Sequence, residues 1–386
     1  MIRGRFGIGL VAVLTLLAGD AAAQTAGHEA DEPSVALLPG EWRNPMRGSS
    51  FYFEQSLSTQ AAHLETSPEQ SYVPFYGWWF SLRPRWNFND KLRVQARLDY
   101  YKELTNSQTT TQYREDVFDD IWTDLVYATP VATSGPWSHT KVTGLVRAQW
   151  PTSKQSQGAG VYVTLGALAG VKQTIPLGGG LFGSAWVDLR FRYLHPFSDS
   201  TTPTNYNDFA YVRENVDGFS FVSHQLTGQT LVANELTSLA EAGVKITPKL
   251  SLSVDVIWID QWHYSVPPGT VAAGPTYATV PGTGQQFTQL IWEVASLEYE
   301  VLDELSLGLG YYNLTNVIAP DGTVRSPFAG GEDNAFWSPD ARIFLTATAN
   351  LDKIYEDVSA GIRSRERAPL PSTEAARAER GPGDGH

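Results

Sequence analysis

The chain has 386 residues, no cysteine, and 41 acidic against 28 basic side chains, which gives a formal net charge of −13. The lack of cysteine excludes a disulfide scaffold and a thiolate metal site. The acidic balance argues against a nucleic-acid-binding protein.

The first 23 residues have the three-part pattern of a cleavable secretory signal. Two arginines and an apolar run from Phe6 to Ala18 precede Ala21-Ala22-Ala23. The run is shorter than the roughly 20 residues that cross a bilayer as a helix. We therefore expect residues 1–23 to be removed on export, and residues 24–49 to form a flexible segment or a short plug.

Two later segments show strict alternation of apolar and polar residues. In 91–100 the apolar set is Leu92, Val94, Ala96, Leu98 and Tyr100, and in 184–193 it is Ala185, Val187, Leu189, Phe191 and Tyr193. A strand places each such set on one side, whereas a helix would mix it with the polar set. Both segments have the length of a tilted membrane-crossing strand.

Ten less regular segments extend the pattern to twelve predicted strands. They lie near 51–61, 77–88, 120–129, 140–150, 160–172, 234–247, 250–260, 287–301, 304–313 and 341–351. The alternation slips around Ile257 and between Val294 and Ala295. We expect a β-bulge to restore the register at each place.

The connections between these segments alternate in length. One set occupies 87–90, 130–139, 175–180, 247–249 and 302–303, and most of these are tight turns. In the other set 102–119, 195–233, 262–286 and 314–340 are long, and 151–159 is the shortest. A membrane barrel with both termini on the inner side has short turns there and long loops outside. A soluble β-sandwich, the alternative, has no reason to follow this rule.

Aromatic residues support the barrel. If the apolar face of each strand meets lipid, the outer strand ends carry one girdle of aromatic side chains, as expected at a membrane boundary. Its predicted members are Trp78, Tyr100, Trp150, Tyr193, Trp258, Trp292 and Tyr311, and a sparser inner girdle has Trp86, Phe88 and Tyr127.

The sequence thus resembles the Gram-negative outer-membrane β-barrel superfamily, in particular its twelve-stranded members, which include small-solute channels and the outer-membrane phospholipase. We expect an all-β, antiparallel up-and-down barrel over residues 50–352, with both termini periplasmic and with membrane lipid and lipopolysaccharide around it. Such barrels often end in an aromatic residue, whereas here a polar segment follows the last strand. We expect residues 353–386 to be a disordered periplasmic tail.

Charged residues occupy the face of the strands opposite the apolar one, so they are predicted to line the interior. The basic residues are Arg83, Arg85, Arg93, Arg97, Arg147, Arg190 and Arg192, and the acidic ones are Asp99, Asp188, Glu241, Asp255 and Glu293. One wall would then be basic and the facing wall largely acidic, which resembles the transverse field of porin channels. The same charges would alternatively form salt bridges that stiffen a narrow barrel.

These features favour a passive channel for small polar or charged solutes, with no cofactor. One alternative is a structural barrel that displays the 195–233 and 262–286 loops for surface interactions. Another is a lipid hydrolase, but no His-x-Ser stretch lies on a predicted strand. Acidic loop residues such as Asp116, Asp119 and Asp120 lack the spacing of an EF-hand, so no metal site is predicted.

Overall fold

A computed structural model describes residues 45–59, 75–105, 114, 116–135, 137–178, 182–199, 201, 211–214, 220–223, 231–265, 287–318, 323–326, 336 and 341–367. The predicted signal, most of the predicted flexible segment 24–49, and residues 368–386 of the predicted tail lie outside these ranges.

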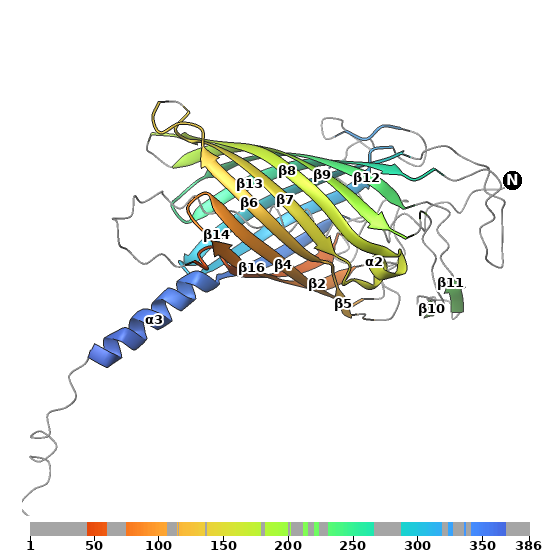
Figure 1. Ribbon diagram of the computed structural model, residues 1–386, viewed down its shortest axis with the longest axis horizontal. Coiled ribbons are helices and arrows are strands. Elements are labelled where there is room, and N and C mark those ends of the chain that lie inside the picture. The colour runs from red at the N-terminus through yellow and green to blue at the C-terminus, as the bar shows by residue number, and fades with distance from the viewer. Residues whose placement is uncertain are drawn as a thin grey trace, which may run out of the picture.

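Twelve long antiparallel strands form one closed up-and-down barrel, as predicted (Figure 1). Each of these strands pairs with its neighbour in sequence, and the first and last strands pair with each other to close the barrel. The strands are β1 (Ser50–Ser58), β2 (Tyr76–Arg83), β4 (Leu92–Glu103), β6 (Ile121–Pro130), β7 (Thr140–Trp150), β8 (Val161–Pro176), β9 (Ser184–Ser198), β12 (Val232–Lys245), β13 (Leu250–His263), β14 (Phe287–Leu302), β15 (Leu305–Asn316) and β16 (Arg342–Asn350). Closure leaves this sheet without an unpaired edge.

Two short strands add to this ring. After an interruption at Pro84, the chain continues in line with β2 as the short strand β3 (Arg85–Asn87). Both β2 and β3 pair with β4. Proline has no backbone N–H to donate to a sheet, which accounts for the interruption. At the other end of β4, the strand β5 (Asp116–Phe118) pairs with its last residues.

The register through β13 and β14 is continuous, so the two predicted β-bulges are wrong. β13 pairs with β14 without a break from Leu250 opposite Tyr299 to Trp262 opposite Phe287. β14 also pairs regularly with β15 around Val294. Because the register does not shift around Ile257 or between Val294 and Ala295, the alternation of sides is not reset at either place. Ile257, Ile259, Trp292 and Val294 therefore point inward.

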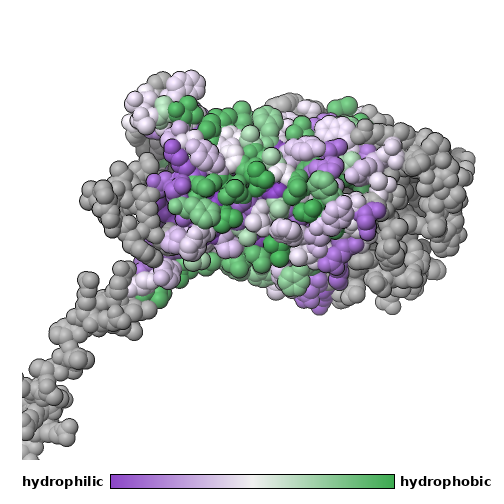
Figure 2. All heavy atoms as spheres, viewed as in Figure 1, coloured by the Kyte–Doolittle hydropathy of each residue, from purple (hydrophilic) through white to green (hydrophobic). Residues whose placement is uncertain are grey.

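The outer face of the barrel carries a belt of large apolar side chains. Figure 2 shows hydrophobic residues gathered over the barrel wall. Exposed members of the belt include Leu98, Leu125, Val146, Leu165, Leu189, Phe191, Leu252, Leu309 and Leu345. A surface of this kind would be unfavourable in water but suits hydrocarbon. A closed barrel with an apolar outer face is the form in which β-strands cross a membrane.

The connections alternate in length, as predicted. The short ones span 88–91, 131–139, 177–183, 246–249 and 303–304, all at the end of the barrel where β1 begins and β16 ends. We call this the turn end and the opposite one the loop end. The connections at the loop end include β5, the helix α2 (Lys154–Gly158), and a separate two-stranded sheet of β10 (Tyr211–Glu214) and β11 (Ser220–Ser223).

Residues 351–367 form the helix α3 (Leu351–Arg367), which corrects the prediction of a disordered tail from residue 353 (Figure 1). The helix follows β16 directly and is fixed at its start. The backbone N–H of Leu351 donates to the carbonyl of Ser49, and the Asp352 carboxylate accepts from the N–H of Gly48 at 2.9 Å. The prediction rested on the polar composition of this segment, which gives no information about these two hydrogen bonds to the start of the barrel. In the described part of the chain, no helix is long and apolar enough to cross a membrane.

Candidate functional site: the interior of the barrel

The strand registers place all of the predicted basic residues on the inner face. Arg97 lies opposite Trp122, Arg147 opposite Asp124, and Arg192 opposite Thr237. Arg83, Arg85, Arg93 and Arg190 share the inward parity of their strands. Four of the predicted acidic residues also face inward, namely Asp99, Asp188, Glu241 and Asp255.

Glu293 is the exception, and its predicted position on the inner wall is wrong. It lies between Trp292 and Val294, whose side chains belong to the interior cluster described below, so it points to the outer side. It pairs there with Val256 and Asn313. Its side chain is nevertheless buried, as is that of Asn313. The prediction assumed a bulge next to this residue, and the continuous register reverses its side.

Trp292 corrects the predicted aromatic girdle for the same reason. It is 0 % exposed and faces Ile257 inside the barrel. The other predicted girdle residues have the outward parity of their strands: Trp78, Tyr100, Trp150, Tyr193, Trp258 and Tyr311. Trp150 and Tyr193 are about half exposed, at 48 % and 46 %.

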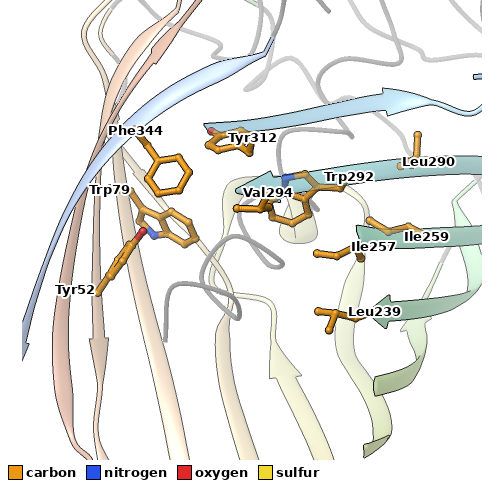
Figure 3. Close-up of a cluster of buried hydrophobic side chains, with 10 residues drawn as sticks. All are labelled: Tyr52, Trp79, Leu239, Ile257, Ile259, Leu290, Trp292, Val294, Tyr312 and Phe344. Atoms are coloured by element: carbon orange, nitrogen blue, oxygen red, sulfur yellow. The ribbon is translucent and has the colours of Figure 1, made fainter. Parts of the chain in front are cut away.

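An apolar arc covers the inner wall from β12 through β16 to β2. Figure 3 shows its members pointing into the barrel from neighbouring strands. They are Tyr52, Trp79, Leu239, Ile257, Ile259, Leu290, Trp292, Val294, Tyr312 and Phe344, each less than a tenth exposed. Edge-to-face ring contacts join Tyr52 to Trp79 at 5.9 Å and Trp292 to Tyr312 at 6.0 Å between centroids. This arc was not predicted, because the apolar side of every strand was assigned to lipid.

The apolar arc interrupts the acidic wall that the sequence predicted. On β13 the inward positions run Asp255, Ile257, Ile259 and Gln261, so two isoleucines separate the carboxylate from the next polar side chain. On β12, Leu239 lies between Thr237 and Glu241 in the same way. The inner wall opposite the arginines is therefore partly acidic and partly apolar.

The facing arginine arc extends over the inner faces of β4, β6, β7 and β9, and consists of Arg97, Asp99, Asp124, Arg147, Arg190 and Arg192 with Trp122 among them. The Trp122 ring lies between two guanidinium groups, with Arg97 4.6 Å and Arg147 3.9 Å from its centroid. Arg97 also lies 5.0 Å from the Trp79 ring, where the two arcs meet. Flat guanidinium groups stack well on indole faces.

Each of these arginines has a carboxylate close by. Arg147 and Asp124 form a bidentate pair, with Nε and one terminal nitrogen donating to the two carboxylate oxygens at 2.7 and 2.8 Å. The Nε atom of Arg97 lies 2.5 Å from an oxygen of Asp99. Arg192 donates to Glu235 at 3.0 Å and to Thr237 at 2.9 Å. Because these pairs are buried, removing one partner leaves the other charge uncompensated.

Charges at the loop end have structural partners as well. The buried Asp120 accepts from the backbone N–H of Ser153 at 2.8 Å and from the Gln149 amide at 3.2 Å, which fixes the start of α2 against β6. The exposed Asp116 accepts from Lys102 at 2.8 Å and also from Tyr100. These two hydrogen bonds, that from Lys102 first, lower the pKa of Asp116. The described residues contain no group of three or more His, Asp or Glu side chains arranged to hold a metal ion.

One histidine on the outer face has an amide partner. The Nδ1 atom of His195 lies 3.1 Å from the side-chain oxygen of Asn234. The residues around it on this face are Leu165 opposite, and Tyr193 and Phe197 along the strand. The partner of His195 is thus an amide, not the hydroxyl nucleophile that a hydrolytic triad places next to its histidine.

No family model matches the sequence, and no curated protein matches it. Among solved structures, the chain is similar to an outer membrane channel from Pseudomonas putida F1, with 8 % identity, a TM-score of 0.44, and coverage of 81 % of this chain and 99 % of that one. It is also similar to the translocator domain of the autotransporter NalP from Neisseria meningitidis, with 11 % identity, a TM-score of 0.36, and coverage of 88 % and 99 %. A third is Salmonella typhi OmpF, at 7 % identity, a TM-score of 0.29, and coverage of 80 % and 99 %.

Proposed function

We propose that this protein is a passive outer-membrane channel for small polar or charged solutes. The observation that carries the proposal is the row of inward-facing guanidinium groups on β2 to β4, β7 and β9, inside a closed barrel with an apolar exterior. Charged side chains on the inner wall of a barrel set the preference of the solutes that pass. The carboxylates and the apolar arc opposite would contribute to that preference.

Arg93 is the residue best suited to a test of this role. It faces inward on β4 and is only partly buried, whereas Arg97 on the same strand is buried between two tryptophan rings. Its hydrogen bond to the Gln95 amide oxygen is long, at 3.5 Å. Its charge can therefore be changed with less disturbance of packing than that of Arg97.

The experiment measures single-channel conductance and reversal potential in a planar bilayer under a KCl gradient. We expect the wild-type barrel to conduct, and Arg93→Glu to shift the reversal potential toward cation preference, because a negative charge replaces a positive one at the path. The matched control, Arg93→Lys, keeps the charge and should keep the wild-type value. A wild-type protein that never conducts, or a reversal potential unchanged in Arg93→Glu, contradicts the proposal.

A second candidate, a structural barrel that supports outer loops, is favoured by the buried ion pairs. Arg147 with Asp124 and Arg192 with Glu235 are nearly inaccessible to solvent, as expected of charges that stiffen a wall. The bilayer recording separates the two functions, because a folded barrel without conductance supports this second one.

A further inference from the structure

Three carboxylates lie side by side across three neighbouring strands of the inner wall. Asp188 on β9 is directly opposite Glu241 on β12, and Glu241 is directly opposite Asp255 on β13. We call these residues the carboxylate row. Like charges in directly opposed positions of a sheet destabilise it. A row of three is therefore maintained against an electrostatic cost.

The positive charges near the row compensate two of its members. Arg190 contacts Asp188 at 2.5 Å and Glu241 at 3.4 Å. The Trp186 ring nitrogen donates to Glu241 at 2.7 Å. Lys172 on β8 lies opposite Asp188. All of these contacts are on the β8 to β12 side of the row, so the compensation decreases toward Asp255.

Asp255 is left with an unsatisfied oxygen atom. Its Oδ1 atom is buried and has no hydrogen-bond partner among the described residues, and the residue is 1 % exposed. A buried carboxylate without a partner gains strongly from a positively charged donor.

The surroundings of Asp255 on its other side are apolar. Val294 on β14 lies directly opposite, and Ile257 is the next inward residue along β13. Both belong to the apolar arc, with Leu239 nearby on β12. These packed neighbours offer Asp255 no polar partner on that side.

We propose that the carboxylate row binds the ammonium group of a small primary amine. A primary ammonium has three N–H donors and one positive charge, which match the unpartnered oxygen and the excess negative charge of the row. The inference rests on the proposed channel function, because the amine reaches the row through the interior.

The experiment is a calorimetric titration of the folded, detergent-purified barrel with n-butylammonium chloride and with 1-butanol, its neutral match. We expect the ammonium to bind at least about tenfold more tightly than the alcohol, because the alcohol donates a hydrogen bond but has no positive charge to pair with the carboxylates. We expect Asp255→Asn to weaken ammonium binding by about the same factor. Glu298→Gln is the matched control, since it removes an inward carboxylate whose partner is Ser306 and should leave binding unchanged.

Equal binding of the two wild-type ligands, no binding of the ammonium, or unchanged binding in Asp255→Asn overturns the carboxylate row as a site. The wild-type comparison decides the question even where a variant fails to fold. Bilayer conductance is recorded separately on the same preparation. Ammonium binding by a barrel that never conducts contradicts the channel and leaves the site, whereas conductance without ammonium preference contradicts the site alone.

Discussion

The arginine arc and the apolar arc are two parts of the same inner wall, and different kinds of contact stabilise them. In the arginine arc, two guanidinium groups lie against the Trp122 ring and each arginine has a carboxylate partner. The stability of this arc therefore depends on individual ion pairs. In the apolar arc, residues such as Ile257 and Trp292 contact one another without polar partners, so stability depends on filled volume. We therefore expect the two arcs to respond differently to loss of charge and loss of volume.

The largest expected effect is in the arginine arc. Asp124→Ala leaves the Arg147 guanidinium buried without its bidentate partner, which should lower the free energy of unfolding by about 3–5 kcal/mol. Urea unfolding in detergent, followed by the heat-modifiable gel mobility of a closed barrel, measures this. Asp116→Ala, which removes an exposed carboxylate, is the control and should shift the midpoint far less. Equal midpoints for wild type and Asp124→Ala would show that the pair does not hold the wall.

Loss of volume tests the apolar arc. Ile257→Ala creates a cavity among Leu239, Trp292 and Val294, and should lower the free energy of unfolding by about 2–5 kcal/mol. Val254→Ala is the matched control on the same strand, since Val254 faces outward and is 38 % exposed. Its cost should remain below about 1 kcal/mol. Equal costs at the two positions would contradict the inward assignment of Ile257. The same urea titration supplies both values.

The smallest effect is expected at the loop end, where Lys102 and Asp116 form an exposed pair. The lowered pKa of Asp116 means that the contact stabilises the folded state above the ordinary pKa of an aspartate, and that this is lost as the pH falls through the lowered value. Hydrogen exchange of residues 116–118 should therefore be faster in Lys102→Met than in wild type at pH 7, and nearly equal in the two proteins at about pH 2, well below the ordinary aspartate value. An equal difference at both pH values would show that the contact is not ionic.

Some of the inner wall was predictable from residue order alone. The strict alternation in 91–100 and 184–193 assigns Arg93, Arg97, Arg190 and Arg192 to the face opposite the apolar residues, and the strand pairing agrees. The closed barrel of twelve strands and the alternation of short and long connections were also predictable. The reason is that a period of two along each strand and the length of each connection are local properties.

The inner apolar arc, the outward position of Glu293, and the helix α3 were decided by the tertiary structure. In 250–260 and 287–301 apolar residues occupy both parities, so the sequence does not say which set meets lipid. Pairing with neighbouring strands on both sides fixes one register, and that register directs Ile257 and Trp292 inward. The start of α3 depends on bonds from Leu351 and Asp352 to residues about three hundred positions earlier. Contacts over that separation exist only once the barrel has closed.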